Sequence, residues 1–148
     1  MDQHTIYTTN TAEETEKLGE RMAVEMKDKN QSIVCLFGNL GMGKTTWTKG
    51  FAKGLGIIDR IISPTFTIIR RYAIAKTSTY FYHIDLYRME NNKQIEAIGL
   101  EEILHDADAI TVIEWPEKIR DMLPKKRIEL HFTSSEGNSR IIDAQIYE

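Results

Sequence analysis

The segment GNLGMGKT, residues 38–45, follows directly after the apolar run SIVCLF of residues 32–37. It satisfies the pattern G-x-x-x-x-G-K-[ST], in which a glycine-rich loop joins a buried strand to a helix. Glycines allow positive φ values and let the backbone approach a ligand closely. Such a loop can point many N–H groups at one cluster of anionic oxygens. The sequence therefore predicts a P-loop that binds a nucleoside triphosphate.

Each residue type in this loop has a function in holding a triphosphate tail. Lys44, a candidate catalytic residue, supplies a positive charge near the β and γ phosphates, and Thr45 offers a hydroxyl to Mg²⁺. The positive dipole end of the next helix faces the same phosphates. We expect the loop to bind the cofactor through Gly38, Asn39, Leu40, Gly41, Met42, Gly43, Lys44 and Thr45.

Length and composition indicate one globular domain spanning residues 1–148, with 41% hydrophobic and 28% charged residues. The formal net charge is −3, which disfavours a protein that grips nucleic acid alone. We interpret the small clusters Arg70–Arg71 and Lys125–Arg127 as solvated surface.

Cysteine usage and hydropathy suggest a cytoplasmic setting. The single cysteine, Cys35, lies in an apolar run and is predicted to be a small buried residue. A disulfide within the chain is excluded, and no apolar run approaches the roughly 18 residues of a membrane helix. The start, MDQHTIYTTN, does not resemble a signal peptide.

Hydrophobic periodicity predicts an α/β fold, which we expect to be a P-loop NTPase-like three-layer domain with a mixed central sheet. Thr11 and Glu14 have capping-box spacing at the start of a helix, whose Leu18, Met22 and Met26 form an apolar face. The expected helices span residues 11–27 and 44–56, with one or two short ones in 91–105. The expected strands lie in 32–38, 63–74, 78–88, 109–115, 127–133 and 140–147.

Two carboxylates end predicted strands and are candidate catalytic and metal-binding residues. Glu114 ends ITVIE, where P-loop proteins place an acidic residue for Mg²⁺, and Asp85 ends YHID. Asp85 is the rival metal ligand, or it positions the attacking water. Thr65 lies in SPTFT, residues 63–67, where a loop can order around Mg²⁺ and the γ-phosphate. No guanine-reading N-K-x-D motif is found, so adenine is preferred by elimination.

Together, GNLGMGKTTWTKG, SPTFTI, YHIDLYR and VIEWPEK resemble the bacterial TsaE family, from Thr11 to at least Glu117. The resemblance implies a P-loop ATPase that binds ATP or ADP with Mg²⁺ and hydrolyses ATP slowly. It implies a function in making threonylcarbamoyladenosine at position 37 of tRNAs that read A-starting codons. The implied partners are TsaB and TsaD, with tRNA reached only indirectly through their complex.

The resemblance also implies functions for residues outside the P-loop pattern. Thr46 would add a hydroxyl near the phosphates, and Trp115 would lie beside the site. Glu114 would be the second magnesium contact, and Asp85 an acidic residue needed for activity. Glu117 would lie near the nucleotide, whereas Arg140 would contact it or face solvent. The start of the first helix, near Thr11, would also pass close to the base, and the side chain of Met42 must point away from the phosphates.

Two other functions remain compatible with the residues. A small-molecule kinase would need an arginine-bearing lid, which is not apparent in 148 residues. A non-catalytic subunit would use ATP binding to control assembly, without turnover. No residue resembles an arginine finger, so we expect weak turnover by the isolated chain.

Overall fold

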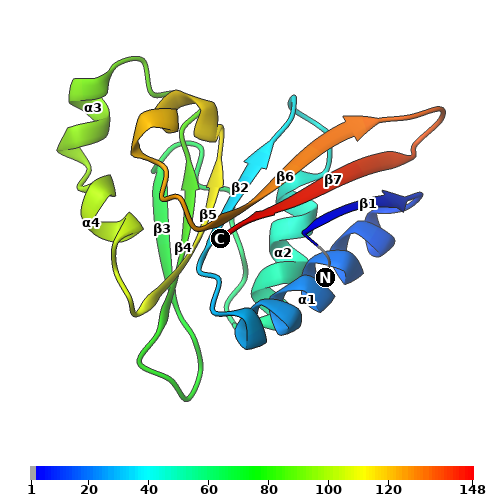
Figure 1. The fold of residues 1–148 in the computed structure, drawn as a ribbon, viewed down its shortest axis with the longest axis horizontal. Helices are drawn as coiled ribbons and strands as arrows, with labels where there is room; N and C mark the ends of the chain where they lie inside the picture. The colour runs from blue at the N-terminus through cyan, green and yellow to red at the C-terminus, as the bar shows by residue number, and fades with distance from the viewer. Residues whose placement is uncertain (1–2) are drawn as a thin grey trace.

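The computed structural model describes residues 3–148, apart from the side chain of Asn92, so the first two residues of the predicted domain lie outside it. It contains a seven-stranded sheet in the order β1-β7-β6-β2-β5-β4-β3 (Figure 1). Strands β6, β2, β5 and β4 run parallel, whereas β3, β7 and β1 pair antiparallel, so the predicted mixed sheet is confirmed. The strands are β1 (His4–Thr9), β2 (Ile33–Phe37), β3 (Ile69–Ala73), β4 (Tyr80–Asp85), β5 (Ala109–Glu114), β6 (Arg127–Ser134) and β7 (Arg140–Tyr147).

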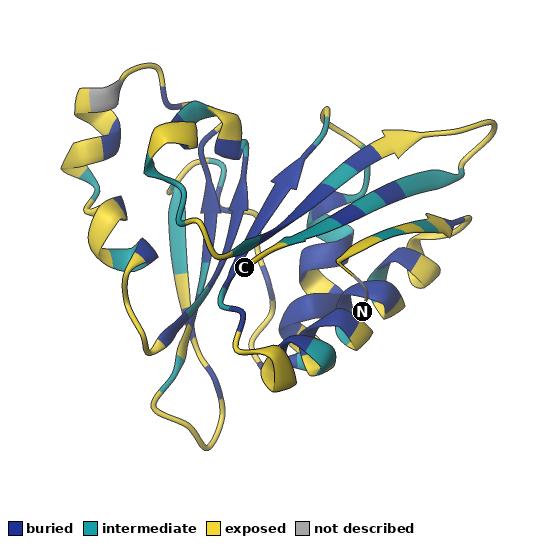
Figure 2. Cartoon of the chain, viewed as in Figure 1, coloured by how far each residue is buried: buried dark blue, intermediate teal, exposed yellow. Residues whose placement is uncertain are grey.

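Helices cover both faces of the sheet and give three layers (Figure 1). One apolar cluster joins α1 (Ala12–Lys29) and α2 (Lys44–Gly54) to the sheet. The other lies under α3 (Asn92–Ala97), α4 (Leu100–Leu104) and the 3-10 helix η1 (Pro116–Met122). Buried residues concentrate on the central strands and on the sheet-facing sides of α1 and α2 (Figure 2). Within residues 3–148, no helix is long and apolar enough to cross a membrane.

Helix α1 begins as its sequence predicts. Thr11 is the N-cap, and its hydroxyl accepts a 3.1 Å hydrogen bond from the backbone N–H of Glu14. In a complete capping box the Glu14 carboxylate would accept from the N–H of Thr11. Here it accepts from the N–H of Asn10, one residue before the N-cap. Leu18 and Met22 are buried with the rest of the apolar face, so the interpretation of this stripe as core is confirmed.

Glycines bring α1 and α2 into close backbone contact. A Cβ atom added to Gly50 would lie 1.8 Å from the carbonyl oxygen of Glu16, and one added to Gly19 would lie 2.2 Å from that of Trp47. No larger side chain fits at these positions without separating the helices. The N-terminus of α2, where the glycine-rich loop ends, is therefore held firmly against α1.

Two elements were not predicted. Strand β1 pairs antiparallel with β7 at the sheet edge, where its side chains alternate only between exposed and half-buried until Thr9. That weak alternation gives little hydrophobic signal. Pro116 ends β5 as expected, but it also begins η1, because a fixed φ and a missing N–H suit the first residue of a helix.

Candidate functional site

The glycine-rich loop leaves β2 and ends at the start of α2. All five residues of β2 are buried, and Gly41 and Gly43 have φ values of 78° and 97°. Within the described chain, no side chain caps α2 and no acidic residue occupies its first turn, whereas α1 has the Thr11 cap and two acidic residues there. The N–H groups at the start of α2 thus remain available for an external anion.

Lys44, the first residue of α2, is only 5% exposed. Its ammonium donates a 2.6 Å hydrogen bond to the Gly38 carbonyl and lies 4.4 Å from the centre of the Trp115 ring. Burial lowers the pKa of Lys44, while the carboxylates of Glu114, Asp85 and Glu117 act in the opposite direction. The lysine therefore places a partly desolvated positive charge where the loop closes on itself.

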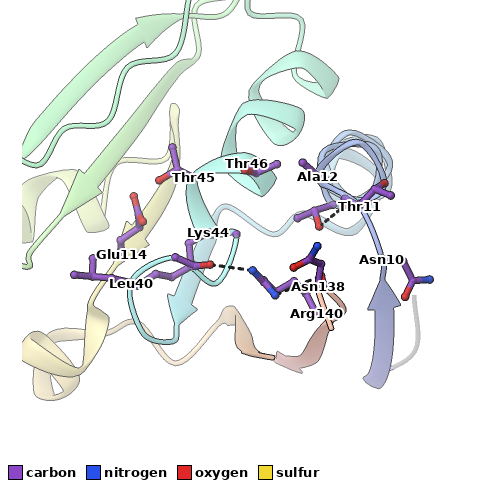
Figure 3. Close-up of a pocket in the computed structure, with 13 residues that line it drawn as sticks. Asn10, Thr11, Ala12, Leu40, Lys44, Thr45, Thr46, Glu114, Asn138 and Arg140 are labelled. Carbon is purple, nitrogen blue, oxygen red and sulfur yellow. Dashed lines mark hydrogen bonds between the residues drawn. The ribbon is translucent and has the colours of Figure 1, made fainter. Parts of the chain in front are cut away.

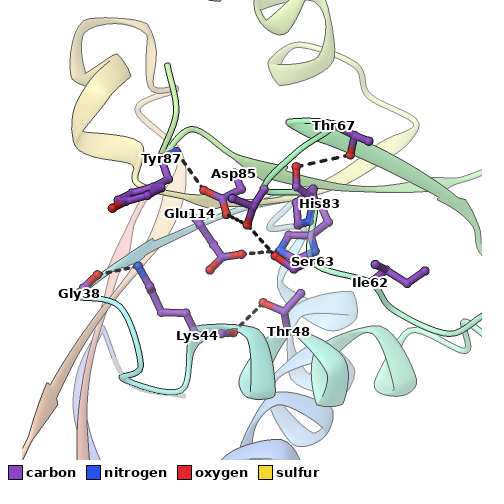
Figure 4. A network of polar contacts seen from close by, with 12 residues as sticks. Gly38, Lys44, Thr48, Ile62, Ser63, Thr67, His83, Asp85, Tyr87 and Glu114 are labelled. Atoms are coloured by element: carbon purple, nitrogen blue, oxygen red, sulfur yellow. Dashed lines mark hydrogen bonds and ion pairs between the residues drawn. The ribbon is translucent and has the colours of Figure 1, made fainter. Parts of the chain in front are cut away.

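Asp85 and Glu114 end neighbouring parallel strands, and the strand register pairs them directly. Both are buried, with 6% and 4% exposure. They share a sheet face with residues that pack against α1 and α2, such as Phe81 on β4, because side chains two or four residues apart along a strand point the same way. The two carboxylates therefore face the layer that carries Lys44 (Figure 4).

Each carboxylate is held by specific donors (Figure 4). Asp85 accepts hydrogen bonds from the Thr65 hydroxyl at 2.9 Å and from the Tyr87 N–H at 3.0 Å. Glu114 Oε2 lies 2.7 Å from Nε2 of His83, which is fully buried. His83 was not predicted as a site residue. A polar residue two positions before a strand-ending carboxylate was the only signal that pointed to it.

A cavity of about 590 Å³ opens between the loop, the start of α1 and the β6–β7 connection (Figure 3). Glu114 and Thr45 lie toward one end and Asn10 lies at the other. Its lining contains the predicted residues Leu40, Gly41, Gly43, Lys44, Thr45, Thr46, Glu114 and Arg140, the Thr11 implied by resemblance, and the unpredicted Asn10, Ala12, Thr15 and Asn138.

Arg140 closes one side of this cavity. Its guanidinium donates to the Gly41 carbonyl at 3.3 Å, which ties β7 to the glycine-rich loop. Ser139 donates a 2.7 Å hydrogen bond to the side chain of Asn10, which ties the same connection to the start of α1. The cavity wall is therefore assembled from residues about 100 positions or more apart, and sequence spacing could not reveal it.

The other predicted site residues lie around the cavity without lining it. Met42 packs against the apolar cluster under α1 and α2, away from the opening, as expected. Asn39 and Glu117 are exposed, and Trp115 covers Lys44. Within residues 3–148, no group of three or more His, Cys, Asp or Glu side chains could hold a metal by itself.

Comparison with known proteins identifies the family. The sequence model of the family described as "Threonylcarbamoyl adenosine biosynthesis protein TsaE" matches residues 9–142. The chain belongs to the TsaE family. A TsaE relative from Bacillus subtilis is 41% identical over 118 residues, which cover 80% of this chain and 70% of the relative. Another, from Rickettsia conorii, is 36% identical over 138 residues, covering 92% and 75%.

A solved structure supports the fold. The crystal structure of Bacillus subtilis YdiB is 32% identical and superposes with a TM-score of 0.79, covering 100% of this chain and 88% of that one. The resemblance to TsaE stated from the motifs is thus confirmed, as is the α/β fold with a mixed sheet. The TsaE match spans the loop, both carboxylates and Arg140.

Proposed function

We propose that this TsaE-family chain binds ATP with Mg²⁺, hydrolyses it weakly and thereby supports tRNA threonylcarbamoyladenosine biosynthesis. The observation that carries the proposal is the uncapped start of α2 beside Lys44, at a cavity large enough for a nucleotide. In this proposal the chain forms one P-loop domain and works in the cytoplasm with TsaB and TsaD. The modified position is adenosine 37 of tRNAs that read A-starting codons.

The residues present fit a triphosphate tail. Gly41 has open space where a Cβ would lie, and its φ of 78° is one that other residues rarely adopt. The ammonium of Lys44 is hydrogen-bonded to the Gly38 carbonyl. A phosphate oxygen bound in the loop could compete with this carbonyl for the ammonium. A charge-assisted hydrogen bond to phosphate is stronger than one to a neutral carbonyl.

The residues also fit Mg²⁺, which prefers oxygen ligands. The Thr45 hydroxyl and the Glu114 carboxylate line the same cavity. Bound Mg²⁺ would neutralise phosphate charge. Asp85 is the strand partner of Glu114 but does not line this cavity. That difference favours Glu114 as the nearer carboxylate, with Asp85 orienting water.

The far end of the cavity suits the nucleoside. Asn10 and Asn138 offer amide donors and acceptors, and Arg140 offers a planar cation on which a base can stack. These groups support adenine binding near the start of α1. The net charge of −3 is consistent with tRNA being held by the partners rather than by this chain.

The test combines binding with function in cells. Calorimetry should show Mg²⁺-dependent binding of ATP and ADP, and nucleoside analysis of tRNA after depletion of this protein should show loss of threonylcarbamoyladenosine. An Asp85→Asn variant that binds ATP normally but fails to restore the modified nucleoside would favour turnover over nucleotide-gated assembly. Stoichiometric phosphorylation of a small acceptor would instead favour a kinase, and absent nucleotide binding would refute the proposal.

A further inference from the structure

His83 lies within the sheet face that carries both carboxylates, yet the proposed function gives it no role. Its side chain has no exposed surface, and it comes two residues before Asp85 on β4. The register pairs His83 with Val112, two residues before Glu114 on β5. The imidazole therefore reaches diagonally to the neighbouring strand, where Nε2 meets Glu114 Oε2 at 2.7 Å.

The contact with a carboxylate assigns the roles of the two ring nitrogens. When Glu114 carries its charge, it only accepts hydrogen bonds, and Nε2 of His83 is then the donor. Nδ1 is buried and has no hydrogen-bond partner within the described residues. On the ring's flank lies Phe81, stacked at a centroid distance of 6.3 Å. An apolar flank and an unpartnered Nδ1 leave the ring one polar contact in this structure, the one to Glu114.

Glu114 is 4% exposed and lines the cavity, and among the described residues its side chain is hydrogen-bonded to His83. With Oε2 bonded to His83, the carboxylate is restrained, and its other oxygen is free to face the cavity. We infer that His83 is a positioning residue that orients Glu114 toward Mg²⁺ in the nucleotide complex. This inference rests on the proposed function. Mutation of a residue that holds a metal ligand in place commonly lowers metal affinity by roughly 10- to 100-fold.

Three substitutions separate orientation from packing. His83→Gln retains an N–H donor at about the reach of Nε2, whereas His83→Asn retains a donor that stops short of Glu114. His83→Leu removes the donor altogether. Ile84→Val is the control, because Ile84 is also fully buried on β4 but belongs to the apolar cluster on the opposite face of the sheet.

The experiment measures ADP binding by calorimetry in EDTA and across a Mg²⁺ titration, with thermal unfolding as a check on folding. In the Asn and Leu variants we expect the Mg²⁺ concentration for half-maximal tightening to rise about tenfold. ADP affinity in EDTA should stay within about twofold of the parent, since Glu114 then has no metal to contact. The Gln variant and the Ile84→Val control should behave like the parent.

The outcomes distinguish this inference from the proposed function. If the parent binds no nucleotide, or binds it equally with and without Mg²⁺, the proposed function fails first. If the parent responds to Mg²⁺ and the Leu or Asn variant responds equally, only the inference fails. If the Leu variant does not fold, the Asn and Gln pair decides, and equal Mg²⁺ dependence in that pair overturns the inference. Unfolding of all three variants would give His83 a purely structural role and would also overturn it.

Discussion

The Lys44 ammonium lies 4.4 Å from the centre of the Trp115 ring while it donates a 2.6 Å hydrogen bond to Gly38. Trp115 reaches this place because its backbone has a φ of 61°, in the left-handed region, directly after Glu114. Such a conformation is uncommon for a tryptophan. The indole thus covers the lysine from the position directly after the strand that carries Glu114. A bound phosphate would have to draw the ammonium away from both the indole and the Gly38 carbonyl.

Replacing Lys44 with Met should weaken ATP binding by about 10- to 100-fold, the value of one hydrogen bond to a charged group. Without nucleotide, the melting temperature should stay equal or rise. Because the pKa of Lys44 is lowered by burial, its charged form opposes folding at neutral pH, and this opposition fades only as the pH rises through the folded-state pKa.

Calorimetry and thermal unfolding check this expectation. Lys49→Met is the control, since Lys49 is exposed on the same helix and does not line the cavity. Equal affinity of the Lys44 variant and the parent would rule out the loop as the phosphate site.

Replacing Thr65 with Val should lower ATP turnover about 2- to 10-fold while nucleotide affinity changes less than twofold. The substitution removes one hydrogen bond to Asp85, and such a bond contributes about 0.5–1.5 kcal/mol. Steady-state kinetics and calorimetry separate the two quantities. Thr77→Val removes a hydroxyl that donates at 2.9 Å to Ile74, in the β3–β4 turn, and should leave both unchanged. A matching loss of affinity in the Thr65 variant would contradict a function through Asp85.

Cys35 should be inert in the native chain. Burial raises the pKa of its thiol to about 12 from an ordinary 9.0, and Glu129 contributes in the same direction. At pH 8 about one thiol in ten thousand would be ionised, even before access is considered. A disulfide reagent should therefore titrate no thiol in buffer and one thiol in urea, since the chain has one cysteine. Rapid reaction of the native chain would mean that β2 opens readily.

Replacing Gly50 with Ala should destabilise the fold by about 3 kcal/mol, at the upper end of the usual range for overpacked cores. The new Cβ would collide with the Glu16 carbonyl, which is backbone and cannot turn aside. Urea unfolding measures the loss. Lys49→Ala, at the adjacent exposed position of the same helix, should change stability by less than about 0.5 kcal/mol. Wild-type stability of the Gly50 variant would show that α1 and α2 are not so closely packed.

Much of the fold was predictable because hydrophobic periodicity agrees with the residues that end helices and strands. The run ending at Phe37, the stripe of α1 and the stop at Pro116 each carry a strong local signal. Strand β1 escaped prediction because an edge strand that is half exposed owes its conformation to β7. The pattern of residues within β1 alone does not indicate that it pairs with β7.

The candidate site was predictable only where its residues are close together in the sequence or end a recognisable strand. The residues from Gly38 to Thr45 form a contiguous pattern, and Glu114 and Asp85 end recognisable strands. Asn10 and Asn138 reach the cavity through the pairing of β1 with β7 and through the bond from Ser139 to Asn10. Such long-range contacts depend on strand order, which periodicity does not specify.

The glycine contacts between α1 and α2 govern how the nucleotide cavity can change shape. Since backbone meets backbone at Gly19 and Gly50, the two helices cannot slide or tilt apart without losing contact along their length. Thr11 and Thr45 therefore belong to a single rigid body, even though they stand on different walls. Any change in cavity shape is therefore expected in other walls, at Leu40 and Gly41 in the loop and at Asn138 and Arg140 near the start of β7. The hydrogen bond from Arg140 to Gly41 would make these two walls move together.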